Sequence, residues 1–511
     1  DLNVAIGSTA LDANTVGDRN VAVGHGALTT FNPSSNADTY NTAVGTLSLK
    51  NLTTGTLNTA VGGQAMELAT TGGSNTAMGY GALNANTTGA DNTAVGTASL
   101  DANTTGAENV AVGKSSLTGN TTGDFNVAIG ENALANNTTA DNNTAVGRRA
   151  MLANTTGAEN VAVGKDALIA NTTAGNNVAV GKDALKANTT GNTNVAIGTD
   201  AMTTNVAGDR NVAVGEQALQ NMNPSGNVDT YNVGIGYNAG LAMTTGIRNT
   251  LVGGLAGDAI TSATRNTGLG YEALSTATTG GNNTAVGSFA QKLLTTGTRN
   301  TAVGDAALNG NQVGTDNTSI GDQTLKVNTA SDNTAVGSHS MFANTTGAEN
   351  TAVGANALDA NTTASGNSAF GVDSLTTNTT GSSNAAYGSN SLKLNTTGGS
   401  NVAIGISALQ ANTTASNNTA VGKSALTTNT TATGHTAVGF KALTANTSGD
   451  QNTAVGSGAA ETNTTGRNNT AVGFEAFHVN TAGEDNVAIG TTALALLTDG
   501  DDNTAVGSGA L

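Results

Sequence analysis

Apolar and polar residues recur along this chain in a fixed order with a period of 17 residues. The repeated unit is Asn-(Thr/Val)-Ala-(Val/Ile)-Gly-x-x-Ala-Leu-x-x-Asn-Thr-Thr-Gly-x-x, and its positions are numbered here from the first Asn. Thirty copies begin between Asn3 and Asn503, separated by 26 intervals of 17 residues, two of 21 and one of 16. The unit is too short for helical repeats, which exceed about 30 residues, and its fixed Gly and Asn disfavour helix. The pattern therefore predicts a repeat array rather than a series of globular domains.

One copy, residues 92–108, illustrates the elements that the pattern predicts. Alternating side chains favour a strand at 93–95 and a second short strand at 99–100, with a turn over 103–108. Each copy is then one coil of an all-β parallel solenoid, with about 30 coils stacked roughly 4.8 Å apart. No linker or change in composition interrupts the series, so residues 1–511 are expected to form a single continuous array.

The same alignment predicts which side chains face the interior. Positions 2 and 4 of a strand point to one side, so Val4 and Ile6, or Thr93 and Val95, are expected to point inward together. Position 9 is Leu or Met in 25 of the 30 copies and supplies the only large apolar side chain of the coil. Position 5 is Gly in every copy, which indicates a backbone conformation or a close contact that excludes a Cβ atom.

Asn at positions 1 and 12 is expected to stack in rows, each amide bonding its neighbour or the turn backbone. The predicted structural rows are represented by Asn20, Gly24, Leu28, Asn86, Asn92, Gly96, Leu100 and Asn103.

Composition and charge remove several classes of function. The chain has 18 Lys and Arg against 35 Asp and Glu, a net charge of −17, which argues against nucleic-acid partners. No apolar run approaches the roughly 18 residues needed to span a membrane. The chain has no Cys, which is compatible with an extracellular location. The absence of an initiator Met and of a signal-like start predicts a processed or partial chain.

The run Asn-Val-Ala-Ile-Gly-Glu-Asn-Ala at residues 126–133 resembles the head repeat of trimeric autotransporter adhesins. The resemblance extends over all 511 residues and implies a left-handed β-roll that associates as a trimer on a cell surface. The unit is about three residues longer than the usual head repeat of that family. In this it is similar to repeats of phage tail fibres and large bacterial surface proteins.

Candidate catalytic groups are scattered rather than clustered. His25, His339, His435 and His478 fall at different repeat positions, so they form no metal-ligand or triad spacing. Asp and Glu fall mainly in turns, as solvated residues would. The sequence therefore indicates no enzyme and no cofactor. Two alternatives stay open: calcium between stacked acidic turns, and glycosylation of the Asn-Thr-Thr sequons, for which a row of buried amides is the competing interpretation.

Two copies carry four-residue insertions, at 31–40 and 222–231, and these hold both prolines of the chain. They are either protruding ligand-contacting loops or tolerated insertions. The candidate contact residues are Asn32, Asp38, Tyr40, Asn223, Asp229 and Tyr231.

The combined pattern predicts a non-enzymatic extracellular or surface-displayed fibre that presents a repetitive adhesive surface to an unknown surface or glycan receptor. A virion tail-fibre shaft is the alternative that the repeats do not separate from it. An ice-binding solenoid is a third hypothesis, based on the Thr rows of the turns. A thin core favours self-association of parallel copies, as a filament or, as the resemblance implies, a homotrimer. The shared axis is expected at the small residues of position 8 or the Leu rows.

Overall fold

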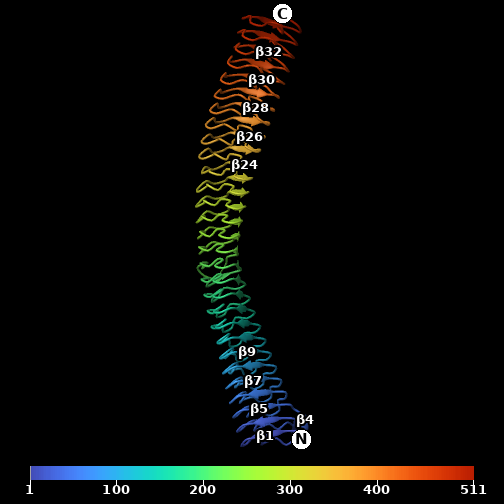
Figure 1. The fold of residues 1–511 in the computed structure, drawn as a ribbon, viewed down its shortest axis with the longest axis vertical. Coiled ribbons are helices and arrows are strands. Elements are labelled where there is room, and N and C mark those ends of the chain that lie inside the picture. The colour runs from blue at the N-terminus through green and yellow to red at the C-terminus, as the bar shows by residue number, and fades with distance from the viewer. Residues whose placement is uncertain (1) are drawn as a thin grey trace. The chain divides into compact units, whose positions relative to one another are not determined.

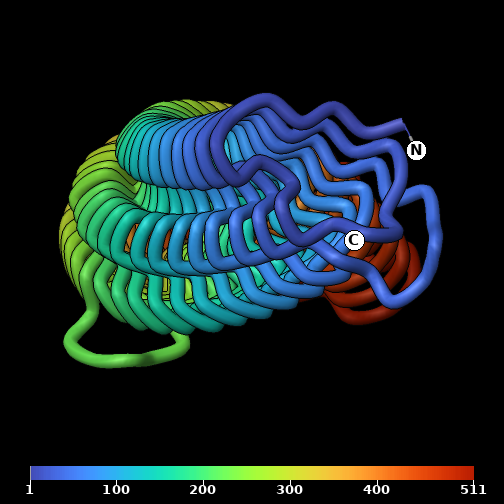
Figure 2. The backbone as a smooth tube through the Cα atoms, turned by 90° about the horizontal axis from the view of Figure 1, so that it is seen from below, coloured from blue at the N-terminus to red at the C-terminus, as the bar shows by residue number. Residues whose placement is uncertain are grey.

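A computed structural model describes residues 2–511, and all regular structure in that range is β. It confirms the parallel β-solenoid with one coil per repeat (Figures 1 and 2). The coils group into two compact units, one ending at Ser262 and the other beginning at Ala263. Each unit contains 15 coils, and each coil contributes one three-residue strand to the sheet of its unit.

The strands of the first unit are β1 (Val4–Ile6), β2 (Gly17–Asp18), β3 (Val21–Val23), β4 (Ala37–Asp38), β5 (Thr42–Val44), β6 (Thr59–Val61), β7 (Thr76–Met78), β8 (Thr93–Val95), β9 (Val110–Val112), β10 (Val127–Ile129), β11 (Thr144–Val146), β12 (Val161–Val163), β13 (Val178–Val180), β14 (Val195–Ile197), β15 (Gly208–Asp209), β16 (Val212–Val214), β17 (Val228–Asp229), β18 (Val233–Ile235) and β19 (Thr250–Val252).

The strands of the second unit are β20 (Thr267–Leu269), β21 (Thr284–Val286), β22 (Thr301–Val303), β23 (Thr318–Ile320), β24 (Thr334–Val336), β25 (Thr351–Val353), β26 (Ser368–Phe370), β27 (Ala385–Tyr387), β28 (Val402–Ile404), β29 (Thr419–Val421), β30 (Thr436–Val438), β31 (Thr453–Val455), β32 (Thr470–Val472), β33 (Val487–Ile489) and β34 (Thr504–Val506).

Register is kept from coil to coil because the same repeat position always pairs with itself. Strand β12, for example, pairs in parallel with β11 and β13, so that Ala162 lies between Ala145 and Ala179. The two insertions keep this register and add short parallel pairs of their own, β2 with β4 and β15 with β17. Figure 2 shows the insertions as loops that extend beyond the neighbouring coils.

The second strand predicted at 99–100 does not form, and that prediction is wrong. In this segment every second residue is left-handed: Ala98 and Leu100 both have φ of 52°. The segment still bonds its neighbours, since the Leu100 amide donates to the Ser116 carbonyl at 2.9 Å and the Ala98 amide to the Tyr80 carbonyl at 3.0 Å. Left-handed Leu is rare because its Cβ approaches the following carbonyl, so sequence pattern alone does not indicate it.

The prediction that positions 2 and 4 point inward is also wrong. In β8, Ala94 is fully buried, whereas Thr93 and Val95 are half-buried on the outer side. At the chain start, Val4 and Ile6 are exposed. The interior is filled instead by Ala at position 3 and Leu at position 9, as with Leu100, which has no exposed surface. A large side chain at position 9 leaves room only for a small one opposite it.

The invariant Gly of position 5 has both properties that its conservation along the repeat suggests. All thirty have φ between 123° and 141°, which residues with a side chain rarely adopt. A Cβ atom on Gly164 would lie 2.4 Å from the carbonyl oxygen of Gly181 in the next coil. At position 5 the distance between adjacent coils is therefore set by direct contact between their backbones.

Candidate functional surfaces

The two Asn rows lie inside the coil, where their amide groups satisfy their hydrogen bonds within each row and at a shared backbone carbonyl. Asn109 donates its backbone and side-chain N–H groups to Asn92 Oδ1, at 3.0 and 3.2 Å. In the second row, Asn103 Nδ2 donates to Asn86 Oδ1 at 2.9 Å. Asn92 and Asn103 also both donate to the Gly106 carbonyl, at 2.9 and 2.8 Å, so one carbonyl joins the two rows. These amides are structural, and because they have no exposed surface the folded chain does not present them for glycosylation.

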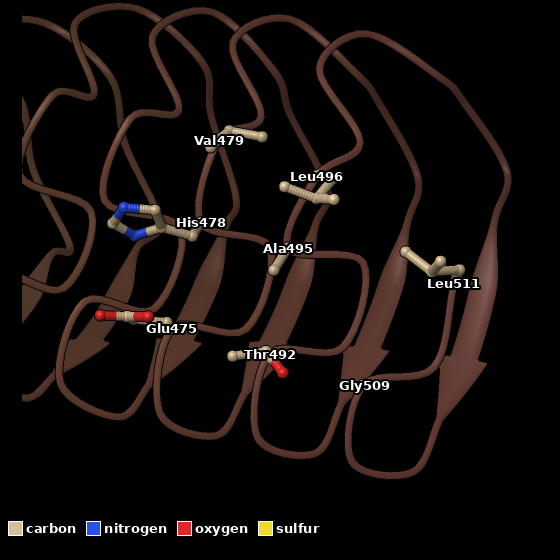
Figure 3. Close-up of a pocket in the computed structure, with 8 residues that line it drawn as sticks. All are labelled: Glu475, His478, Val479, Thr492, Ala495, Leu496, Gly509 and Leu511. Atoms are coloured by element: carbon tan, nitrogen blue, oxygen red, sulfur yellow. The ribbon is translucent and has the colours of Figure 1, made fainter.

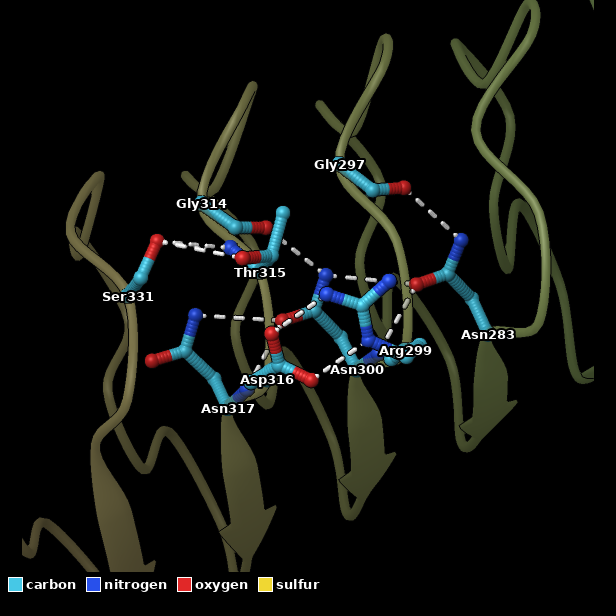
Figure 4. A network of polar contacts seen from close by, with 9 residues as sticks. All are labelled: Asn283, Gly297, Arg299, Asn300, Gly314, Thr315, Asp316, Asn317 and Ser331. Carbon is cyan, nitrogen blue, oxygen red and sulfur yellow. Dashed lines mark hydrogen bonds and ion pairs between the residues drawn. The ribbon is translucent and has the colours of Figure 1, made fainter.

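Figure 4 shows the first row in the second unit, where Asn283, Asn300 and Asn317 bond in succession. Beside it, Arg299 forms a two-pronged ion pair with Asp316 of the next coil, with both N–O distances at 2.7 Å. The guanidinium lowers the pKa of the Asp316 carboxyl from its ordinary value. The pair lies at the surface, where such contacts contribute little stability.

The remaining predicted structural residues occupy equivalent places. Asn20 is buried and donates its backbone N–H to Asn3 Oδ1 at 2.8 Å. A Cβ on Gly24 would lie 2.6 Å from the carbonyl oxygen of Gly45, and Gly96 repeats that geometry with the carbonyl of Gly113. Leu28 is fully buried, with φ of 53°.

A further set of side chains, at position 16, bonds the preceding coil, whereas the sequence predicted solvated turn acids with surface calcium as the alternative. Asp124 Oδ1 accepts the Ala107 amide of the preceding coil at 2.7 Å, and Asp141 Oδ1 accepts the Asp124 amide at 2.8 Å. In the second unit Ser365 does the same for Ala348. The preference for Asp, Asn or Ser at this position was the available signal, since short oxygen-bearing side chains bond nearby backbone amides.

His435 replaces Asn at position 1 and disturbs the row. Its Nδ1 accepts the Asn452 amide at 3.2 Å, and its Nε2 faces Asn446 Nδ2 at 3.1 Å. Burial lowers the pKa of this imidazole to about 4, so it is neutral at pH 7 with its proton on Nε2. That N–H then faces the Asn446 amide nitrogen, which is also a donor. The imidazole therefore bonds its neighbours in the row less well than Asn does.

Each insertion contributes an Asp and a Tyr to the same kind of cluster, and an Arg from earlier in the chain completes it. Arg19 pairs with Asp38 at 2.8 Å, and its guanidinium lies 5.5 Å from the centre of the Tyr40 ring. In the second insertion Arg210 pairs with Asp229 and donates to the Tyr231 hydroxyl at 2.8 Å, while that hydroxyl donates to Asp229 at 3.1 Å. Both tyrosines are about half exposed, at 47% and 45%.

The two predicted Asn contacts differ from these clusters. The Asn32 backbone amide donates to the Thr53 carbonyl at 3.0 Å, and its Oδ1 accepts the Thr15 hydroxyl at 2.8 Å. The Asn223 amide likewise donates to the Thr244 carbonyl at 2.9 Å. The start of each insertion is therefore tied into the stack, while the Arg-Asp-Tyr clusters are its exposed part.

One cavity, of about 420 Å³, lies beside Leu511 among the last coils (Figure 3). Its lining is mostly apolar, including Val479, Ala495 and Leu496, with Glu475 and His478 at one side. Within residues 2–511 no three His, Cys, Asp or Glu side chains gather as metal ligands would. The cavity therefore offers an apolar surface and no set of reacting groups.

The outer face of the sheet is the most extensive regular surface. Position 2 is Thr or Val in all but two coils, and position 4 is Val, Ile or another apolar or aromatic residue in every coil. These side chains remain partly exposed, as with Ile129 at 39% and Ile197 at 40%. No charged residue occurs at either position, so an uncharged stripe runs along the length of each unit. This stripe of position-2 and position-4 side chains is called here the outer sheet face.

No protein-family model matches the chain, and no curated protein shows significant similarity to it. The described residues also form no helix long and apolar enough to cross a membrane.

Proposed function

We propose that this chain is a segment of a non-enzymatic extracellular or surface-displayed fibre whose copies associate side by side through the outer sheet face. The observation that carries the proposal is an apolar sheet face that every coil repeats and leaves partly exposed. The side chains at the inner corner are Asn amides, while Val and Ile side chains of β10 and its neighbours remain partly exposed to solvent. Parallel sheets ordinarily have both faces covered, so a second copy is the occupant that the repeated surface favours.

The position of this contact differs from the one expected from the sequence. Residues at positions 8 and 9, such as Ala167 and Leu168, are fully buried within their own chain and are not available to a partner. A shared axis at those positions is therefore wrong. Positions 2 and 4 are the side chains that remain exposed in the same coils.

The size of the face is adequate for a stable contact. Fifteen coils at about 4.8 Å give a stripe roughly 70 Å long in each unit, and a three-residue strand makes it about 10 Å wide. Two such stripes cover roughly 1,400 Å², within the range of specific interfaces. The absence of charge along the stripe means that no ion loses its water on association.

The mass of the protein in solution tests this proposal. We expect three copies of 49.7 kDa, about 149 kDa by light scattering, as the resemblance to adhesin heads implies. Replacing Val146, Val163 and Val180 together with Glu places three charges on the outer sheet face and should shift the mass toward the monomer. The matched control puts Glu at exposed Thr139, Thr156 and Thr173, which lie at position 14, and should keep the oligomer. A monomeric parent protein, or equal masses for the two variants, would contradict the proposal.

An ice-binding solenoid is the second candidate, and one observation favours it. Thr at position 2 and Val at position 4 are spaced by two on an in-register sheet, as with Thr284 and Val286 beside Thr301 and Val303. The Thr rows of the turns are less suitable, since the Thr87 hydroxyl is used within the stack and donates to the Thr104 carbonyl at 2.9 Å. Thermal hysteresis in a concentrated solution would support this candidate, because a face buried between copies cannot contact ice.

A further inference from the structure

Three successive coils carry a cation at position 6, immediately after the strand and its Gly. These are Arg148, Lys165 and Lys182, and all three are exposed. Since β11, β12 and β13 pair in register, the three side chains leave the chain at the same place on each coil, about 4.8 Å apart. Lys186 lies four residues further along the last of these coils and is also exposed. These four residues are called here the cationic ridge.

The carboxylates near the ridge lie beneath it rather than on it. The side chains of Asp166 and Asp183 are only 4% and 10% exposed, whereas those of Lys165 and Lys182 are 48% and 56% exposed. Arg149 holds Asp166 through two contacts of 2.7 and 2.9 Å and lowers the pKa of that carboxyl. Lys165 lies 3.6 Å from Asp166, and Lys182 and Lys186 lie 3.4 and 3.2 Å from Asp183, so these carboxylates pair with the ridge from below. The cations outnumber the two carboxylates and are the more exposed partners, so the solvent meets an excess of positive charge.

This local balance is opposite to that of the whole chain. Residues 148–186 contain five Lys and Arg against three Asp and Glu, whereas the complete sequence carries a net charge of −17. In the second unit the cations are more dispersed and commonly pair with an acid of a nearby coil. Lys393 with Asp373, at 3.0 Å, and Lys441 with Glu461, at 3.1 Å, are examples.

We propose that the cationic ridge binds a linear acidic polysaccharide, whose carboxylate or sulfate groups repeat along its length as the cations repeat along the coils. A ligand of this kind gains from each added coil because the anions of one polymer are already linked. The ridge contains none of the aromatic side chains on which nucleic-acid bases stack, since residues 148–186 include no Phe, Tyr or Trp.

A second copy of the chain fits the ridge less well. Asp166 and Asp183 are largely buried under the ridge, and Asp124 and Asp141, at the amino ends of the strands, already accept backbone amides. The ridge lies beyond the carboxyl ends of the strands, beside the outer sheet face rather than on it. Glycan binding and self-association therefore use different side chains of the same coils.

Titration with defined glycans tests the inference. The probes are labelled oligogalacturonate for carboxylate, heparin oligosaccharide for sulfate, and dextran as a neutral control. Binding to either acidic probe is expected, with none to dextran. Its affinity should fall with salt as roughly three counterions are released. Replacing Arg148, Lys165 and Lys182 together with Ser should weaken binding roughly tenfold or more.

The variants are chosen so that folding and assembly do not confuse the result. Thr97 and Ser288 stand at position 6 in other coils, so a small polar residue is compatible with the backbone there. Lys423→Ser removes a cation at the same position outside the ridge and should leave binding unchanged. Failure of both acidic probes to bind, equal affinity for the triple variant, or tighter binding of single-stranded DNA would overturn the inference.

This inference deepens the proposed adhesive role by naming its receptor chemistry, and the two fail separately. The triple Ser variant should keep the parent mass by light scattering even when glycan binding is lost. A monomeric parent protein that still binds the acidic glycans would reject the side-by-side fibre and keep the ridge.

Discussion

The inner corner and the outer sheet face of one coil have opposite polarity. At the corner, Asn92 and Asn103 are fully buried amides, and every coil repeats a glycine whose backbone touches the next coil. On the outer face, Val95 and its equivalents are apolar and partly exposed. The comparison teaches that saturated hydrogen bonds and backbone contact hold the turns of this solenoid together, while Ala and Leu fill most of the rest of its interior. Most of its β-branched side chains are left for a surface outside the coil.

The largest expected effect comes from disrupting the backbone contact that a position-5 glycine makes with the next coil. Gly164→Ala would put a Cβ 2.4 Å from the Gly181 carbonyl oxygen at a φ of 140°, so we expect a loss of about 3 kcal/mol or more. Amide hydrogen exchange should show the coils around residue 164 opening. The control is Gly63→Ala at position 6, where the nearest atom lies 3.4 Å away on a Tyr80 ring and little change is expected.

The packing of position 3 against position 9 can be tested where the chain itself exchanges the two residues. Leu251 stands where other coils have Ala, and a Cβ on Gly257 would lie 2.8 Å from its Cδ2. Leu251→Ala should cost about 3 kcal/mol by leaving a cavity, and Gly257→Leu should be destabilising by overpacking. Combined, the two changes should cost less than their sum, since φ of Gly257 is already 55° and the other close atom, Ile260 Cδ1 at 2.7 Å, ends a flexible side chain. A double-mutant cycle that gives additive costs would reject this account of the core.

Removing one amide of an Asn row should lower the free energy of unfolding by less, about 2 kcal/mol. Asn103→Ala takes away the acceptor that Asn120 Nδ2 uses at 2.9 Å and the donor that Asn86 Oδ1 uses at the same distance. Thr105→Ala, at the exposed position 14 of the same coil, should change the free energy of unfolding by under about 0.5 kcal/mol. Exchange protection of neighbouring amides distinguishes the two, and equal protection in both variants would show that the row is dispensable.

The smallest effect concerns the imidazole in the row and depends on pH. Because burial lowers the pKa of His435 to about 4, the unfolded chain takes up the proton first as pH falls below about 6.5. Stability should therefore decline between pH 6.5 and 4, by about 1.4 kcal/mol at pH 5.5. His435→Asn should remove this part of the pH dependence in thermal unfolding of the full chain. A decline that persists unchanged in the variant would place its origin elsewhere.

Much of this architecture follows from the sequence because each coil repeats the same constraint. The period, the position-5 glycine and the paired Asn positions each have one simple physical explanation. Which side chains of the strand face the interior was not predictable, because Thr-Ala-Val alternates equally well with Ala inward or with Thr and Val inward. What decides it is the burial of Leu100, which leaves room for Ala94 inside, and that burial depends on a left-handed Leu that the sequence does not signal. Leu251 opposite Gly257 was the available clue, since the two change size together.

The most direct test of the central claim is whether the outer sheet face is covered in the native protein. The chain has no Cys, so a single thiol can be introduced by Ile129→Cys on the face or Glu131→Cys two residues later, at exposed position 6. Ile129 is 39% exposed in the single chain, so an uncovered face would let its thiol react with a maleimide reagent. The account predicts rapid labelling of the Glu131→Cys variant and strong protection of the Ile129→Cys variant. Equal labelling rates in the native protein would show that the face is open and would contradict the side-by-side fibre.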